Sequence, residues 1–234
     1  MQVTLLELPY DSGWAHRRMG AGPQHLLEHG LEQDLRDQHD LDVQQLQSSG
    51  EFSTEIHTSF ALYRQLAQQV RAARQQSRYP LTLAGNCGAA LGMTASLQDG
   101  ALGVIWLDAH GDFHTPETTS SGFLDGMALA TLTGRSWPTL AAAIPGFRAV
   151  LPQRVVHVGG QAMDDPEREA METVGVHRVG ARSIHDHGAA AALEGGLRAL
   201  QVRVPDAAGH LGSGWAEQLF PGFGASPARV ESSS

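Results

Sequence analysis

Short apolar runs alternate with longer segments of helical periodicity along most of this chain. The runs carry many β-branched residues and are typical of buried strands. They lie at residues 2–8, 42–46, 81–85, 102–110, 154–160 and 176–181. Several of the segments between them repeat apolar residues at the spacing of a helix. This alternation predicts an α/β fold with a mainly parallel sheet and crossover helices.

The clearest helical pattern covers residues 53–78. Its apolar side chains fall on one stripe, and Ser53 or Thr54 is suited to cap the N-terminus. The stripe contains Phe60, Leu62, Tyr63, Leu66 and Val70. Shorter helices are predicted at 88–98, 125–134, 165–173 and 188–201.

The pattern changes beyond about residue 204. There the sequence is rich in Gly, Ala, Ser and Pro, and neither a strand period nor a helix period is sustained. We therefore predict one domain over residues 1–204 and an irregular, disordered tail over 205–234.

Composition narrows the class of protein. The chain has 234 residues, of which 41% are hydrophobic, enough for a sizeable core. Its net charge is −9, with 16 basic and 25 acidic residues and no basic block, which argues against binding nucleic acid or an anionic membrane. A small-molecule partner is expected, and whether the chain forms a homo-oligomer is left open.

The location is expected to be cytoplasmic. Cys87 is the one cysteine and cannot form an internal disulfide, and the first residues carry neither a basic segment nor a long apolar one. The longest apolar runs are far shorter than the roughly 20 residues of a membrane-spanning helix.

The segment "WLDAHGDFHT" (106–115) carries the densest candidate chemistry. Asp108, His110 and Asp112 occupy alternate positions at the end of an apolar run. In an extended backbone they would project to one side, about 6.6 Å apart per pair. Each alone could be a turn cap, a core histidine or a loop acid. Together, two carboxylates and an imidazole favour a metal site for Mn, Fe or Zn.

The segment "DAHGDFHTPETTSSGFLDGM" (108–127) resembles the metal and substrate loops of the ureohydrolase superfamily of arginases, agmatinases and formiminoglutamases. The stretch 8–31 is similar to that family's first loop and helix, and "LAGNCGAALG" to its first metal-ligand turn. "VVHVGGQAMDDPE" and "VHRVGARS" are similar to later strands and loops. The resemblance covers roughly residues 5 to 185.

This resemblance implies a three-layer α/β/α fold that holds two Mn²⁺ ions. A hydroxide bridging the ions would attack the carbon of a guanidino or formimino group. Asp108 would bridge both ions, and His110 and Asp112 would bind one each. Asp112 would also accept a hydrogen bond from the hydroxide, which makes it a catalytic candidate.

The same resemblance implies the substrate contacts. His114 and Ser121 match positions that contact the polar end of the substrate. Asp164 and Glu167 match positions that contact an amino group or the leaving amine.

Two residues depart from the family pattern. Cys87 stands where most members have a histidine ligand, and a thiolate suits Zn or Fe better than Mn. A branch acting on hydroxylated arginine has a similar turn, so ligand and buried apolar residue remain equal alternatives. Asp125 stands where arginases carry a proton-shuttle histidine, which makes it the second catalytic candidate. It could hold a cationic substrate or cap a helix beginning near Gly126, and capping is slightly favoured.

The expected second ligand pair is missing. Family members carry a strand reading roughly Ser-x-Asp-x-Asp-x-x-Asp-Pro after the helix near 188–201. This chain has Asp206 there without a second aspartate two positions away. We therefore expect incomplete C-terminal strands, as a frameshift near Pro205 and Asp206 would produce. A partial site would hold one ion or bind weakly.

Two functions are compatible with these sequence features. The first is a metal-dependent hydrolase of a guanidino or formimino compound. The second is a non-catalytic relic that keeps part of a metal-binding loop. The remaining histidines are scattered without ligand spacing, apart from the "HDH" motif at 185–187, whose histidines could bind a metal but are interpreted as surface residues.

Overall fold

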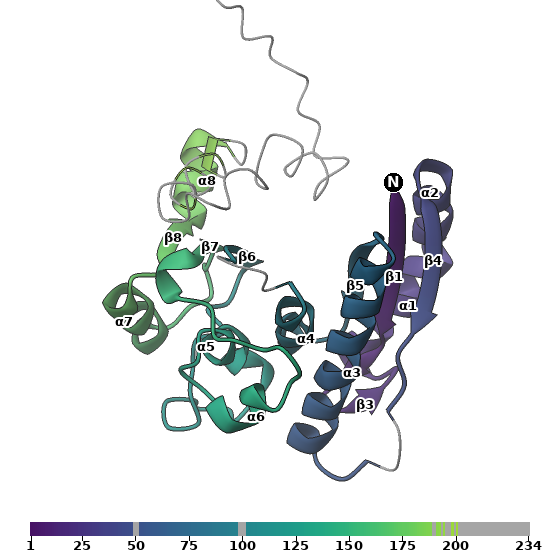
Figure 1. Cartoon of the computed structure of the whole chain (residues 1–234). Coiled ribbons are helices and arrows are strands. Elements are labelled where there is room, and N and C mark those ends of the chain that lie inside the picture. The colour runs from purple at the N-terminus through teal and green to yellow at the C-terminus, as the bar shows by residue number, and fades with distance from the viewer. Residues whose placement is uncertain are drawn as a thin grey trace, which may run out of the picture.

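Two parallel sheets of three strands form the framework of the protein (Figure 1). The first has the order β4-β1-β5, from β4 (Asp40–Gln45), β1 (Gln2–Leu8) and β5 (Tyr79–Ala84). The second has the order β6-β7-β8, from β6 (Val104–Asp108), β7 (Val155–Gly159) and β8 (His177–Gly180). The computed structural model describes residues 1–48, 52–97 and 102–188, with 191, 192, 194, 198 and 200 beyond them.

Helices and short turns connect the strands. A small hairpin follows β1, formed by β2 (Tyr10–Asp11) and β3 (Trp14–Ala15). The helices are α1 (Gly22–Leu26), α2 (Glu32–Gln38), α3 (Glu55–Gln75), α4 (Ala90–Ala95), α5 (Ala128–Leu132), α6 (Pro138–Ala142), α7 (Asp165–Val174) and α8 (Ala181–His187). Single helical turns are η1 (Arg18–Ala21), η2 (Leu27–Leu31), η3 (Cys87–Ala89), η4 (Asp125–Met127) and η5 (Pro152–Arg154).

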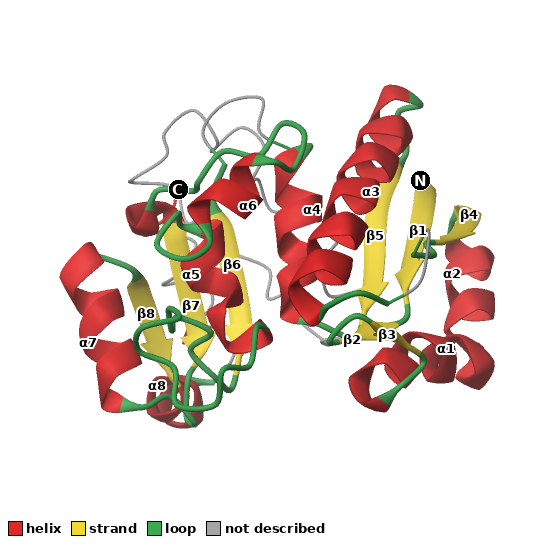
Figure 2. Cartoon of the chain, turned by 90° about the horizontal axis from the view of Figure 1, so that it is seen from below, coloured by secondary structure: helices red, strands yellow, loops and turns green. Residues whose placement is uncertain are grey.

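Strand β1 shows why the first sheet is covered on both faces. Val3 and Leu5 pack toward residues of α2 and η2, whereas Leu6 and Leu8 pack toward α3. Successive side chains of a strand point to opposite faces, so an almost wholly apolar strand needs cover on each side. Figure 2 shows α3 on one side of this sheet and α1 and α2 on the other. The predicted three-layer parallel α/β fold is confirmed.

Within the described residues, no strand of one sheet pairs with a strand of the other. β5 pairs with β1 alone, and β6 pairs with β7 alone. The largest apolar cluster links the two halves, because Phe60 of α3, Leu91 of α4, Leu129 of α5 and Trp106 of β6 belong to it. Helix packing therefore connects the two sheets where strand hydrogen bonds do not.

The predicted elements agree well with the observed ones. Each of the six apolar runs overlaps a strand, and Thr54 caps α3 by accepting a hydrogen bond from the His57 backbone N–H at 3.1 Å. The helices predicted at 88–98, 125–134 and 165–173 correspond to η3 with α4, η4 with α5, and α7. The described residues of the predicted helix at 188–201 beyond Gly188 are helical, whereas the predicted tail at 205–234, with Asp206, lies outside the described residues.

The pattern missed some of the short helices, among them α6 and α8. α6 and α8 have five and seven residues, too few for a helical period to stand out. α8 carries His185 and His187 of the "HDH" motif, and both are exposed. Within the described part of the chain, no helix has both the length and the apolar character to cross a bilayer.

Candidate metal centre

The candidate ligands lie on the two loops that follow β5 and β6. In parallel sheets the carboxyl ends of strands are where ligands bind. The loop after β5 begins with Gly85, whose backbone packs against Tyr10 and Gly20 so closely that a Cβ atom would clash with both. This glycine allows the turn carrying Cys87 to lie against the N-terminal loop.

Asp125 connects the two loops. Its buried carboxylate accepts hydrogen bonds from Asn86 Nδ2 at 3.0 Å, from Cys87 N at 3.0 Å and from Gly88 N at 2.8 Å. These donors belong to the start of η3, so Asp125 satisfies backbone N–H groups that a helix start leaves free. The loop after β6 is thereby fixed to the turn after β5.

The prediction that Asp125 caps the helix beginning near Gly126 is wrong about which helix is capped. The sequence favoured a cap for the helix that begins near Gly126. Leu124 occupies that N-cap position, and no side chain caps it. Asp125 does cap a helix start, but it is the start of η3 after β5. The two residues whose backbone N–H groups it binds, Cys87 and Gly88, lie 38 and 37 residues earlier in the sequence.

Three predicted ligands come together. The donor atoms of Cys87, Asp108 and Asp112 all lie within 4.8 Å of one another. Cys87 Sγ donates a hydrogen bond to Asp108 Oδ2 at 3.5 Å. Asp112 is 6% exposed, and its Oδ2 atom has no hydrogen-bond partner within the described residues. An unpartnered buried carboxylate oxygen is costly, so this donor set fits a divalent cation.

The electrostatics of the cluster also favour a bound cation. Burial, followed by the neighbouring Asp108 and Asp125, raises the pKa of Asp112 to about 8. Burial and the carboxylates of Asp125, Asp112 and Asp108 also raise the pKa of the Cys87 thiol well above its ordinary value. Negative charge is thus crowded into a partly dehydrated space, and a bound cation would favour the ionised forms of these groups.

His110 lies outside this cluster. β6 ends at Asp108, and Asp112 has a φ of 51°, in the left-handed region that Asp tolerates better than most residues. The extended geometry expected for 108–112 is therefore wrong, because the chain turns after Asp108. The His110 side chain is 68% exposed, with Nδ1 at 3.3 Å from Asp108 Oδ1. Turning of the loop brings Asp112 to Asp108 and leaves the imidazole exposed beside Asp108, outside the group formed with Cys87 and Asp112.

His157 is a buried residue of β7 that the sequence reading passed over. It is 1% exposed, and its Nε2 atom donates to the His110 carbonyl oxygen at 2.7 Å. Burial lowers the pKa of this imidazole, which favours its neutral form. The sequence did offer a signal for this role. His157 is the one histidine within the apolar run of β7, and β7 pairs with β6, the strand that leads into the loop with Asp108 and Asp112.

A second group of predicted residues is also brought together. His114 Nε2 lies 3.2 Å from Asp164 Oδ2 and 3.8 Å from Glu167 Oε2. Asp164 caps α7 by accepting from Glu167 N at 3.0 Å, and the buried Glu167 accepts from Phe113 N at 2.9 Å. Two carboxylates are thus held beside the metal loop, where they can bind a positive group.

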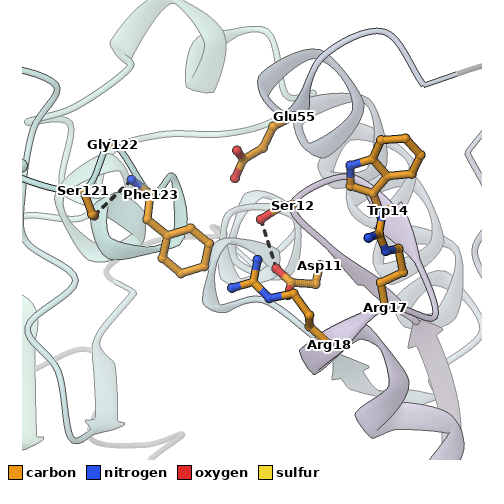
Figure 3. Close-up of a pocket in the computed structure, with 9 residues that line it drawn as sticks. All are labelled: Asp11, Ser12, Trp14, Arg17, Arg18, Glu55, Ser121, Gly122 and Phe123. Atoms are coloured by element: carbon orange, nitrogen blue, oxygen red, sulfur yellow. Dashed lines mark hydrogen bonds and ion pairs between the residues drawn. The ribbon is translucent and has the colours of Figure 1, made fainter.

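Ser121 lies apart from that group. It belongs to the loop that precedes η4, and its Oγ atom accepts a hydrogen bond from Phe123 N at 3.2 Å. Together with Gly122 and Phe123 it lines one side of a cavity of about 350 Å³, and the residues around β2, β3 and η1 line the other side (Figure 3).

Comparison with known proteins identifies a family whose sequences resemble most of this chain. Residues 1–205 match the family model described as "Arginase family". The arginase of Bacillus subtilis is 30% identical over 186 residues, covering 74% of this chain and 62% of that protein. The arginase of Bacillus caldovelox is 30% identical over 188 residues, with the same two coverages. The chain thus spans about three fifths of the length of these relatives.

Solved structures agree with the sequence comparison. A crystal structure of the Bacillus subtilis arginase superposes with a TM-score of 0.75 at 28% identity, covering 86% of this chain and 71% of that one. The Bacillus cereus arginase gives a TM-score of 0.77 at 25% identity with the same coverages. The Bacillus subtilis formimidoylglutamase, 14% identical with a TM-score of 0.62, shares the fold.

The raised pKa of Asp112 generates a prediction for metal binding. With a pKa of about 8, this carboxyl carries a proton at neutral pH, and a cation must displace that proton. Mn²⁺ affinity should therefore strengthen at least about tenfold per pH unit up to about pH 8. Calorimetric titration with Mn²⁺ between about pH 6.5 and 8.5 measures this. Asp112→Asn should bind weakly at every pH, and a flat profile in the unmodified chain would contradict the assignment.

Cys87 generates a second prediction. If its sulfur is a ligand, Cys87→His should increase the Mn²⁺ retained after dialysis, since an imidazole suits this ion better than a thiolate. Cys87→Ala is the matched control and should retain less than the unmodified chain. Equal retention in all three proteins would assign the thiol to packing instead.

Proposed function

This chain belongs to the arginase family, and we propose that its metal centre serves the hydrolysis of a C–N bond in a guanidino or formimino compound. The observation that carries the proposal is the cluster of Cys87, Asp108 and Asp112 at the carboxyl ends of β5 and β6. Mn²⁺ is the ion we assign to it, from the family and from the two carboxylates.

The proposed reaction needs a nucleophile at neutral pH. Divalent ions, when bound, supply it by lowering the pKa of water. Asp108 and Asp112 would hold the ion through carboxylate oxygens, with Cys87 as a third ligand. Asp112 would also accept a hydrogen bond from the attacking hydroxide, as its match to the family implies.

The remaining candidates are assigned to substrate binding and positioning. The carboxylates of Asp164 and Glu167, joined by His114, would bind an amino group of the substrate. Ser121 would contact its polar end. The three hydrogen bonds of Asp125 favour a role in positioning the turn that carries Cys87 over a role in proton transfer.

A second candidate function is a non-catalytic protein that binds one metal ion. Within the described residues the cluster offers three ligands, and the sequence after residue 201 carries Asp206 without the second aspartate of the family's pair. The chain also spans 62% of the Bacillus subtilis arginase. A dinuclear centre needs ligands on both sides of the two ions, so this alternative requires its own test.

The decisive experiment is product release by the Mn²⁺-loaded chain. Urea from L-arginine and agmatine, and formamide from formiminoglutamate, are measured for the unmodified chain, for Asp112→Asn and for Asp165→Asn. We expect release of one product, lowered at least about 100-fold in Asp112→Asn because a metal ligand is lost. Asp165 is an exposed residue of α7, so its variant should retain activity. Tight Mn²⁺ binding without release of any of these products would favour the non-catalytic alternative.

A further inference from the structure

A second cavity lies beside the N-terminal end of α6. It has a volume of about 380 Å³, in the range of small-molecule pockets, and two segments of the chain form its walls. One is the turn with Pro116 and Glu117, and the other covers residues 135–140. None of the candidate metal ligands or substrate-binding residues is among its lining residues. We propose that this cavity binds an α-amino acid with an apolar side chain, through Arg135 and Glu117.

Arg135 offers a guanidinium group that can bind the carboxylate of the ligand. Its guanidinium carbon lies 5.6 Å from the ring centroid of Phe113. In the part of the chain that the structure describes, this guanidinium has no ion pair and no hydrogen bond. A guanidinium that packs on an aromatic face keeps the N–H donors in its own plane available for the two oxygens of one carboxylate. Arg135 is therefore oriented by the ring and still free to bind an anion.

Glu117 supplies the opposite charge from the other wall. It is exposed, and a hydrogen bond from the Thr115 side chain lowers its pKa, so it is ionised at neutral pH. The structure describes no ion pair between Glu117 and Arg135, although both line the cavity. An anion or a cation alone would meet one like charge in this cavity, whereas a zwitterion offers an opposite charge to each residue. The two charges therefore match the carboxylate and the ammonium group of an amino acid.

The rest of the lining is mainly apolar and favours an apolar side chain on the ligand. Pro116, Pro138, Leu140 and the half-buried Trp137 contribute to it. An indole and two proline rings present flat apolar surfaces, on which an aromatic ring can stack. An amino acid such as phenylalanine would therefore find a partner for each of its three groups.

Trp137 has a strained backbone at this wall. Its φ of 44° and ψ of 42° lie in the left-handed region, which a bulky residue rarely adopts. The surrounding contacts maintain this conformation, because Trp137 Nε1 donates to Met127 Sδ at 3.3 Å and the Trp137 carbonyl oxygen accepts from Ala141 N at 3.0 Å. Strained residues of this kind cluster at sites that bind ligands. The conformation of Trp137 thus supports a ligand site independently of the two charges.

The loop that carries Arg135 is fixed without a ligand. The backbone N–H groups of Arg135 and Ser136 both donate to the Ala130 carbonyl oxygen, at 2.8 and 3.2 Å. Ser136 is buried beneath the cavity wall. A wall that is already ordered loses little conformational entropy when it binds a small molecule.

Binding measurements on the Mn²⁺-loaded chain test the proposal. The chain is titrated calorimetrically with L-phenylalanine, with hydrocinnamate, which lacks only the ammonium group, and with phenethylamine, which lacks only the carboxylate. We expect L-phenylalanine to bind at least about tenfold more tightly than either analogue. Arg135→Gln should reduce its affinity to that of phenethylamine, and Glu117→Gln should reduce it to that of hydrocinnamate. Arg182→Gln in α8 and Glu169→Gln in α7 are the charge-matched controls at exposed positions and should leave binding unchanged.

The remaining results also decide the proposal. L-leucine, titrated in parallel, tests an aliphatic side chain, and its binding with the same response to both variants supports the site. Hydrocinnamate binding that equals that of L-phenylalanine and is unaffected by Glu117→Gln would show an anion site and overturn the amino-acid assignment. The proposal is also overturned if neither amino acid binds with a Kd below about 1 mM, or if neither variant weakens binding. None of these probes carries a guanidino or formimino group, so the result is independent of the proposed function.

Discussion

The carboxylate of Asp125 holds the two halves of the metal centre together. No strand hydrogen bonds join the two sheets within the described residues, so the loops after β5 and β6 depend on other contacts for their relative position. Asp125 supplies three hydrogen bonds to the turn that carries Cys87, and hydrogen bonds to a charged acceptor contribute about 1.5–3 kcal/mol each. Through Asn86 the same network reaches Asp11 and its ion pair with Arg18.

This arrangement concentrates negative charge. Burial raises the pKa of Asp125, although its hydrogen bonds to Gly88, Cys87 and Asn86 oppose that shift. Asp112 lacks such donors at Oδ2, and its pKa rises to about 8. A cation that binds only the folded chain would stabilise the fold by an amount that grows with the logarithm of its concentration once this exceeds the Kd. Metal binding and stability are therefore linked in this protein through the same carboxylates.

The sequence predicted the framework because strands and long helices leave strong periodic patterns. Buried parallel strands read as apolar runs, and α3 is long enough for its stripe and its cap to be recognised. For the site, the sequence predicted which residues meet more reliably than it predicted their arrangement in space. Cys87, Asp108 and Asp112 do meet, but the turn after Asp108 leaves His110 exposed at the edge of the group, and no local pattern encodes that turn. The link from Asp125 to the turn after β5 and the contact of His157 with the loop are tertiary contacts, which periodicity cannot reveal.

The most direct test of this account is the metal content of the unmodified chain. Elemental analysis after saturation with Mn²⁺ and dialysis counts the ions that the buried cluster retains. The described ligands predict about one equivalent of Mn²⁺ per chain, lost in a variant with Asp108→Asn and Asp112→Asn together. Retention of no Mn²⁺, or of two equivalents, would contradict a single cation site formed by Cys87, Asp108 and Asp112.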